Sequence, residues 1–485
     1  MVILHTKPFY KNLFFVFISA FSLRALIFSG YIINDTRYRQ ADSNDYHVSA
    51  ISIIKGAGMS RIPSGQPIFW RTPGYPWYLS LFYRLCGVQN NSFNDNHTAQ
   101  KLALWMQIFL CSFIPIIIFF LALTLTHALS IAWISAWICV LHIGFILSST
   151  FLLTEGLALL FFYLFLIFFF KSFYVLSEKP IDDRDWKKNL MYAGLFLGIT
   201  TWLRPMGEFV SILCSLLILL CAHDTLFNRL KKIGLFLCIF YICLVPWYIR
   251  NYRLTDSFFF CPMFGTYLNS FVAPKIVRDL EKQPLEIAWT QLQEQAYKKA
   301  IHDHPIKRLQ GKYVVPEHTA LFVALPIIKA HPFIALKVWM PEVIKTAFDL
   351  HSYQLIALAN DTYKSDPLEE FLSAKISGAL YKEFAPRWIR IICWIDFIFT
   401  LWLWVSLILG MCIFWLIPSF KKWAVSQDIK EMASFWFKMA FITGGIIFMT
   451  GGYGYARLRL PVEPLMIITA LTLWIPSIKY YVKKA

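Results

Sequence analysis

The sequence predicts an all-α, polytopic membrane protein. Of its 485 residues, 58% are hydrophobic and only 15% are charged, a balance that no soluble globule of this size could bury. The apolar residues also occur in long blocks, and about 20 residues are enough to cross the hydrocarbon layer as a helix. Because lipid offers the backbone no hydrogen-bond partners, such blocks must be helical.

Ten apolar blocks follow one another along the chain. They cover residues 12–33, 102–126, 129–148, 151–170, 190–203, 209–222, 233–249, 391–417, 433–451 and 460–478. The blocks at 190–203 and 209–222 are short for complete spans and are also compatible with a re-entrant hairpin. The sequence therefore predicts a bundle of eight to ten transmembrane helices.

The net charge of +17 lies mainly in short connections between these blocks. Lys and Arg cluster before the first block, after the fourth, sixth and eighth, and after the last. If the N-terminus is cytoplasmic and the spans alternate, every cluster falls on the cytoplasmic side, as the positive-inside rule requires. This distribution argues against nucleic-acid binding. We expect an integral protein of a bacterial inner (plasma) membrane with both termini in the cytoplasm.

Two long connections then lie outside. We expect three parts, namely an N-terminal transmembrane module (1–249, with the first external loop at 34–100), an external segment (250–390) and C-terminal transmembrane helices (391–485). In the external segment, 321–340 is predicted as one packed or interfacial helix. Leu285, Trp289, Leu292 and Ala296 recur at helical spacing and predict an amphipathic helix.

The first external loop is predicted to contain two short helices that lie along the membrane surface. Tyr46, Ala50, Ile53 and Ile54 share one face of the first helix, and residues 71–87 form the second.

Asp42 stands where the chain enters the first of these helices. An Asp in that place is most often an N-cap, so on its own it favours a cap over a catalyst by about two to one. Asp45 is interpreted as a solvated acid of the first turn, where it complements the helix dipole.

Ionisable residues inside spans are costly and usually functional, and here they collect toward the non-cytoplasmic side. The acids are Glu155, Glu208, Asp396 and Glu463, and the bases are Arg204, Arg250, Arg457 and Arg459. One interpretation is a set of structural ion pairs, for instance Arg204 with Glu208. The other is a polar site, in which arginines bind the phosphate of a lipid-linked donor and a carboxylate accepts a proton from an attacking hydroxyl. The second interpretation predicts glycosyl transfer from a polyprenyl-phosphate sugar, with arginine stabilising the departing phosphate.

Several short motifs, taken in their order and spacing, resemble the GT-C superfamily of integral membrane glycosyltransferases. The similarity is greatest to the relatives of protein O-mannosyltransferases and aminoarabinose lipid A transferases. The motifs are Asp42-x-x-x-Tyr46 followed by Gly56, RTPGYP at 71–76, TEGLALLF at 154–161, LRP at 203–205, PWYIRNY at 246–252 and R-x-R-x-P at 457–461. The resemblance covers most of 10–270 and returns at 390–478.

The resemblance implies an enzyme of cell-envelope glycan biogenesis that transfers a hexosyl or pentosyl group from a polyprenyl-phosphate donor at the extracytoplasmic face. It implies that Asp42 is the general base, which reverses the preference for a cap, and that Glu155 is a second catalytic acid. The remaining implied positions are Arg204, Arg457, Arg459 and Arg250 at the donor phosphate, with Tyr46, Arg71 and Tyr75 in support. Mannosyltransferase-like members often have Asp-Glu where this chain has Asp42-Ser43, which leaves the subfamily open.

The predicted partners are the polyprenyl-phosphate sugar, membrane lipids and a glycan, lipid or protein acceptor, with no nucleic acid. No cofactor and no metal ligand is identified, and a requirement for a divalent metal stays open. His302, Asp303 and His304 superficially suggest a metal site, but without further ligands they are interpreted as a solvated loop.

Two other classes remain as alternatives. A transporter or flippase for a lipid-linked saccharide would use the same arginines, but it commonly shows internal repeats and broken helices near the midplane, and no convincing repeat is evident. A lipid-linked glycan polymerase or ligase also has many spans and a large external loop. The Asp42-x-x-x-Tyr46 and RTPGYP motifs speak against it.

Overall fold

The computed structural model describes residues 7–33, 37–40, 42–61, 65–88, 96–172, 183–221, 224–303, 312–352, 354–355, 387–412, 427–450 and 456–475. Within these residues the regular structure is helical, and the one isolated β-bridge joins Ser60 to Pro67. The predicted all-α class is confirmed.

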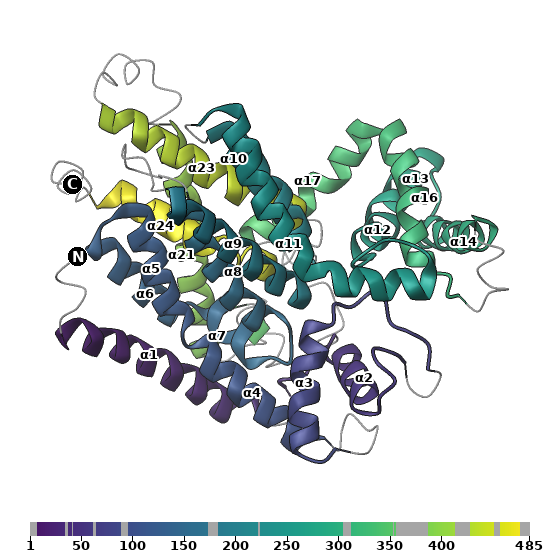
Figure 1. Cartoon of the computed structure of the whole chain (residues 1–485), viewed down its shortest axis with the longest axis horizontal. Helices are drawn as coiled ribbons and strands as arrows, with labels where there is room; N and C mark the ends of the chain where they lie inside the picture. Colours follow the sequence, from purple (N-terminus) through teal and green to yellow (C-terminus); the bar gives the residue numbers. More distant parts are fainter. Residues whose placement is uncertain are drawn as a thin grey trace.

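The described part of each apolar block lies mainly in one or two helices of a bundle (Figure 1). The bundle helices are α1 (Lys7–Ile27), η2 (Phe28–Ile32), α4 (His97–Cys111), α5 (Ile114–Thr126), α6 (Leu129–Leu141), α7 (Ile143–Thr150), α8 (Glu155–Lys171), α9 (Asp183–Leu203), α10 (Gly207–Cys221), α11 (Leu226–Thr255), α21 (Arg387–Met411), α23 (Gln427–Thr450) and α24 (Glu463–Trp474). The helix α8 is buried on all sides, since it packs against α5, α7 and α9. It therefore forms the centre of the bundle.

Four helices in the described ranges are long and apolar enough to cross a membrane by themselves: Lys7–Gly30, His97–Thr126, Leu226–Thr255 and Arg387–Met411. The number rises to 6 if each of two bent helix pairs is one span. The other blocks are helical but shorter or begin with charges. The block at 129–148 is not one straight span, because α6 and α7 bend by 52° at His142. In the short pair, α9 has 21 residues, enough for a span, whereas α10 has 15.

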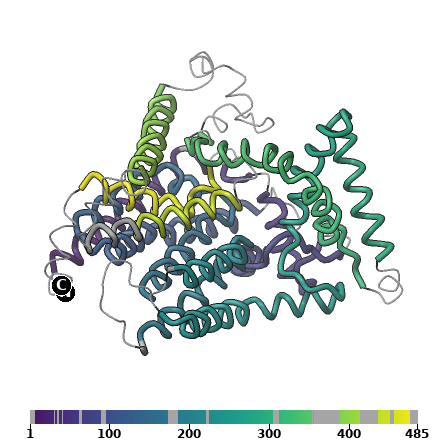
Figure 2. Tube along the Cα trace, turned by 90° about the horizontal axis from the view of Figure 1, so that it is seen from above, coloured from purple at the N-terminus to yellow at the C-terminus, as the bar shows by residue number. Residues whose placement is uncertain are grey.

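The segments expected outside gather at one end of the bundle (Figures 1 and 2). They are α2 (Ser43–Ile54), α3 (Gly74–Leu85), α12 (Met263–Tyr267), η4 (Leu268–Val272), α13 (Ala273–Glu281), α14 (Leu285–Asp303), α16 (Pro316–Ala330) and α17 (Pro332–Phe348). The helix α1 begins and α24 ends near the opposite end (Figure 1). Which side of a membrane each end faces, and the division into three parts, stay predictions.

Two details of the second external segment differ from the sequence prediction. The region 321–340 is not one helix, because α16 and α17 bend by 111°. The amphipathic helix α14 exists, but its buried face is turned by one residue relative to the predicted one at its start. Leu285 and Trp289 are exposed, while the buried residues are Ala288, Leu292, Ala296 and Ala300.

Candidate active site

Asp42 occupies the N-cap position of α2, but its side chain does not cap the helix. Ser43 fixes the start of α2 instead, since its Oγ accepts the Gln40 N–H at 2.8 Å and donates to the Leu152 carbonyl at 2.8 Å. The Asp42 carboxylate turns away from the helix and accepts a hydrogen bond from Arg71, with 2.7 Å between Oδ1 and Nη2. The capping interpretation of Asp42 is therefore wrong.

Five charged side chains form one chain of alternating sign, which we call the ion-pair chain. It begins at Arg71, whose Nη2 lies 2.7 Å from Asp42 Oδ1, and continues to Arg457, whose Nη2 lies 3.7 Å from Asp42 Oδ2. Arg457 Nη1 then lies 3.5 Å from Glu155 Oε1, and the same oxygen lies 2.8 Å from Arg204 Nη1. Residues far apart in the sequence thus meet at one place.

The RTPG turn sets the position of two of these arginines. Thr72 Oγ1 donates to the Leu203 carbonyl at 2.8 Å, which docks the turn on the end of α9. A Cβ atom on Gly74 would lie 2.6 Å from the Trp202 carbonyl oxygen, so only glycine allows this close approach. Because Arg204 follows directly after α9, the same contact brings it beside the turn.

Glu155 is the first residue of α8, and close packing fixes its backbone. A Cβ atom on the following Gly156 would lie 2.8 Å from the Ser148 carbonyl oxygen, so the start of α8 rests against α7. The Glu155 side chain is only 7% exposed, and Thr154 Oγ1 donates to its Oε2 at 3.3 Å. The Glu155 carboxylate, whose backbone is fixed by this packing, therefore pairs with both Arg204 and Arg457.

The two tyrosines predicted to support the site, Tyr46 and Tyr75, pack next to Arg71 of the ion-pair chain. The Arg71 guanidinium lies 5.3 Å from the centre of the Tyr46 ring, and Tyr46 meets Tyr75 edge to face at 5.2 Å. Tyr75 Oη donates to Gln107 Oε1 at 2.9 Å, and Gln107 Nε2 donates to two carbonyls in the segment before α8. Burial raises the pKa of Tyr46 to about 12, so its phenol is neutral.

The charges around Asp42 keep it ionised. Burial by itself would raise its pKa, but the positive charges of Arg71 and Arg457, with the hydrogen bond from Arg71, outweigh burial and lower the pKa below its ordinary value. Asp45 is also paired, with 3.0 Å between its Oδ2 and Arg71 Nε, rather than simply solvated. The Asp42 side chain remains 34% exposed, so a carboxylate is accessible at neutral pH.

A small pocket opens beside the ion-pair chain. Glu155 and Arg457 supply its charged wall, and Phe151, Leu153 and Leu460 supply apolar walls. The charged wall of this pocket suits an anion, such as a phosphate oxygen.

Comparison with known proteins identifies the fold. Residues 74–259 match the family model described as dolichyl-phosphate-mannose-protein mannosyltransferase. The archaeal oligosaccharyltransferase AglB from Archaeoglobus fulgidus, solved with an inhibitory peptide and a dolichol-phosphate, matches with TM-score 0.52 and 11% identity over 97% of this chain and 51% of AglB. An Archaeoglobus fulgidus oligosaccharyltransferase tethered to an acceptor peptide matches with TM-score 0.50 and 10% identity over 98% of this chain and 50% of that one. The chain has the GT-C fold.

This fold agrees with the GT-C resemblance seen in the sequence, and its long apolar helices are those of an integral membrane protein. It spans about half the length of the AglB chain that it matches. ArnT from Cupriavidus metallidurans, solved with undecaprenyl phosphate, gives TM-score 0.41 and 13% identity over 92% of this chain and 77% of ArnT. No curated protein sequence gives a significant match.

Arg250, predicted at the donor phosphate, lies elsewhere in this GT-C structure. Its guanidinium stands 4.4 Å from the Trp247 ring centre and 5.1 Å from that of Phe69. Its Nη2 donates to the Met59 carbonyl at 3.1 Å and its Nη1 to the Ile68 carbonyl at 3.3 Å. These contacts hold the backbone at Met59 and at Ile68 and give Arg250 a packing role.

Arg459 also lies apart from the ion-pair chain, although Arg457 is two residues away. It is fully buried, and its Nε donates to Glu463 Oε1 at 2.7 Å. Its Nη1 donates to the carbonyls of Thr346, Ala347 and Asp349 at the end of α17. A guanidinium that satisfies the last carbonyls of a helix is a structural cap.

The expected pair between Arg204 and Glu208 is replaced by another arrangement. Arg204 pairs with Glu155, and the Glu208 carboxylate accepts a hydrogen bond from Tyr248 Oη. The interpretation of the outer charges as structural ion pairs therefore holds for Arg459 with Glu463, but not for Arg204 with Glu208.

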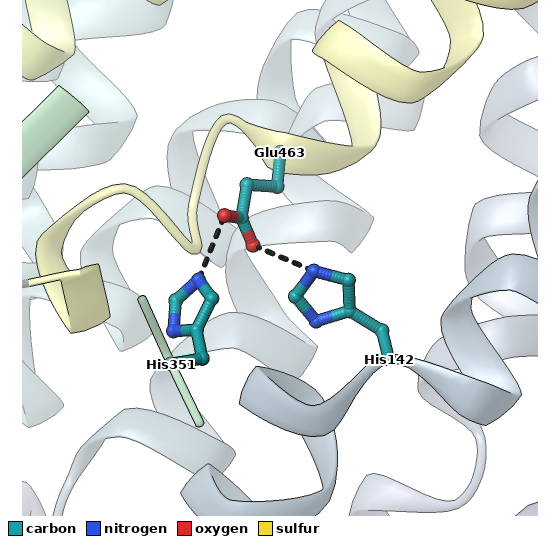
Figure 3. Close-up of side chains that lie close together, drawn as sticks. All are labelled: His142, His351 and Glu463. Atoms are coloured by element: carbon teal, nitrogen blue, oxygen red, sulfur yellow. Dashed lines mark hydrogen bonds and ion pairs between the residues drawn. The ribbon is translucent and has the colours of Figure 1, made fainter. Parts of the chain in front are cut away.

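A buried group of His142, His351 and Glu463 was not predicted as a unit (Figure 3). The available signal was His142 itself, because an ionisable residue within a span usually has a partner or a function. Because the three residues are far apart in the sequence, their contact could not be predicted from it. The histidine motif that had drawn attention is open to solvent, with the His302 side chain 90% exposed, and His304 lies outside the described residues.

Proposed function

We propose that this GT-C protein is a glycosyltransferase that moves a sugar from a polyprenyl-phosphate donor to an acceptor hydroxyl at the extracytoplasmic membrane face. The observation that carries the proposal is the ion-pair chain, which sets an ionised Asp42 beside Arg457 and the pocket. The match to the mannosyltransferase family supports glycosyl transfer. The dolichol-phosphate in the AglB structure supports a lipid-linked donor.

In the proposed reaction, Asp42 accepts the proton of the acceptor hydroxyl while that oxygen attacks the anomeric carbon of the sugar. The bond between this carbon and the phosphate oxygen breaks, and the lipid phosphate leaves with one more negative charge. A single displacement of this kind inverts the anomeric configuration. The proton ends on the carboxylate and the negative charge on the phosphate, so the step is balanced without a cofactor.

Arg204 and Arg457 are the proposed ligands of the lipid phosphate. Their side chains are 22% and 30% exposed, in contrast to the fully buried Arg459. Arginine offers a planar set of N–H donors that fits a phosphate and stabilises the charge that develops as the phosphate departs. Glu155 touches both guanidiniums and is proposed to position them rather than to transfer a proton.

Deleting the gene tests the reaction class. We expect at least one envelope glycan, lipid or protein to lose the mass of one hexosyl or pentosyl unit, and the corresponding polyprenyl-phosphate sugar to accumulate. Mass spectrometry of envelope fractions from deletion and complemented strains measures both. A flippase would give another result, in which wild-type protein moves the lipid-linked sugar across vesicles without forming any new glycosidic bond.

The pH dependence of transfer tests the base. Because Asp42 works when deprotonated and its pKa is depressed, we expect activity to be kept above its ordinary pKa and to fall only as the pH drops below that value. Arg71→Gln removes the nearest cation, so the pKa of Asp42 rises and the acid limb moves to higher pH. The measurement is kcat/KM for the donor against pH in detergent.

Arg84→Gln is the matched control, because Arg84 is an exposed arginine at the end of the neighbouring helix α3. Its acid limb should coincide with that of the wild type. An unmoved limb in Arg71→Gln would remove Asp42 as the group that titrates.

A further inference from the structure

A second buried polar group adjoins the pocket, which His351 and Leu460 both line. His142 comes from the break between α6 and α7, His351 from the turn after α17, and Glu463 from the first turn of α24 (Figure 3). His351 Nε2 lies 2.7 Å from Glu463 Oε1, and His142 Nε2 lies 3.3 Å from Glu463 Oε2. One ligating atom from each residue lies within 4.8 Å of the others.

Several atoms of this group are buried without a hydrogen bond. Within the described part of the chain, neither ring nitrogen of His142 makes one, nor does Glu463 Oε2. All three side chains are 3% exposed or less. A buried polar atom without a hydrogen bond costs about 1–3 kcal/mol, so atoms of this kind that face one another point to a ligand.

We propose that His142, His351 and Glu463 bind a divalent metal ion of the zinc class. Two imidazoles and one carboxylate are a ligand set that Zn²⁺ takes, and bonds of about 2.0–2.1 Å in a tetrahedron place neighbouring ligand atoms roughly 3.3 Å apart. The separation of His142 Nε2 and Glu463 Oε2 is 3.3 Å. Glu463 Oε1 accepts from Arg459 Nε at 2.7 Å, which orients the carboxylate and leaves Oε2 for the metal. His351 Nε2 also lies 2.7 Å from Oε1, and metal binding would exchange this contact for a bond to the ion.

The surrounding charges favour a cation. Three buried carboxylates act on this group, those of Glu463, Asp349 and Asp396, whereas the buried guanidinium is that of Arg459. Acidic side chains thus outnumber the buried guanidinium around the three residues. An excess of acidic groups at a buried site favours a bound cation.

The local packing is built to admit the second histidine. A Cβ atom on Gly144 would lie 2.7 Å from His351 Cγ and 2.8 Å from its Nδ1, so a larger residue would displace the ring. His351 also lines the pocket that contains Arg457. The bound metal would therefore join α6, α24 and the turn after α17, and fix the segment that carries Arg457. This inference does not depend on the proposed glycosyl transfer.

Metal content of the purified full-length protein tests the site. After removal of loose ions by a weak chelator, we expect about one zinc per chain by elemental analysis and at least a tenfold loss in His142→Gln and in Glu463→Gln. Reloading the stripped wild type with Co²⁺ should give the visible absorption of a tetrahedral Co²⁺ centre, and Zn²⁺ should raise its thermal midpoint.

Two histidine variants serve as controls. His47→Gln removes another fully buried histidine, which hydrogen-bonds to Tyr83 Oη at 2.9 Å, and it should keep its metal. His302→Gln removes an exposed histidine and reports adventitious binding. If His142→Gln or Glu463→Gln does not fold, the metal content and the Co²⁺ spectrum of the wild-type protein test the proposal without the variants. Substoichiometric zinc with no Co²⁺ spectrum, or full metal in folded Glu463→Gln, would overturn the proposal.

Discussion

Replacing Asp42 with Asn is expected to slow sugar transfer by about 10²–10⁴-fold, the range that a positioned general base contributes. In the wild type, Arg71 Nη2 lies 2.7 Å from Asp42 Oδ1. Asn keeps the size of the side chain and an oxygen that can accept this hydrogen bond. It removes the negative charge that would take the proton of the acceptor. Initial rates at saturating donor, with protein amount matched by quantitative immunoblot, measure the effect.

Asp45→Asn is the matched control for this substitution. Asp45 lies in the first turn of the helix that Asp42 precedes, and its Oδ2 lies 2.9 Å from Arg71 Nη2. The side chains of Asp45 and Asp42 are 36% and 34% exposed. We expect it to lose much less activity, because Asp45 is not linked to Arg457. Equal losses in the two variants would show that Arg71 needs its ion pairs and that neither acid is the base. Asp42→Glu should keep a measurable part of the rate, since it keeps a carboxylate.

The helices were predictable because burial in lipid demands long apolar blocks and leaves the backbone no alternative to the helix. The breaks were less predictable. The bend at His142 has no proline to announce it, and the residue simply takes an extended conformation between α6 and α7. In α14, small alanines line the buried face, while the larger Leu285 and Trp289 point outward. Residue size and hydrophobicity therefore misplaced that face.

The site residues were predictable one by one, but their pairing was not. Sequence spacing favoured Arg204 with Glu208, four residues apart, because neighbours on the chain are the natural candidates. In the fold, Arg204 lies just beyond the end of α9 and pairs with Glu155. The Glu208 carboxylate accepts a hydrogen bond from Tyr248 Oη instead. The same reason hid the group of His142, His351 and Glu463. Motifs indicate which chemistry is present, whereas only the packing of distant helices decides which charges meet.

Arg457 and Arg459 are expected to fail in different ways when each is replaced by Gln. Arg457 is partly exposed and pairs at 3.5 Å and 3.7 Å, so its loss should change stability little, as for other exposed ion pairs. If it binds the lipid phosphate, transfer should fall by about 10²–10³-fold, the usual cost of removing one donor to a developing charge. Initial rates and the midpoint of thermal unfolding in detergent measure the two effects.

Arg459→Gln should show the opposite pattern. Arg459 is 0% exposed and holds Glu463 together with the end of α17, and removing one partner of a buried pair costs about 3–5 kcal/mol because the other charge stays behind. The thermal midpoint should therefore drop sharply, and activity should fall only in proportion to the folded fraction. Arg457 and Arg459 are separated only by Leu458, so the same substitution is compared within one local sequence. Loss of folding in Arg457→Gln, or full stability in Arg459→Gln, would exchange the roles assigned to them.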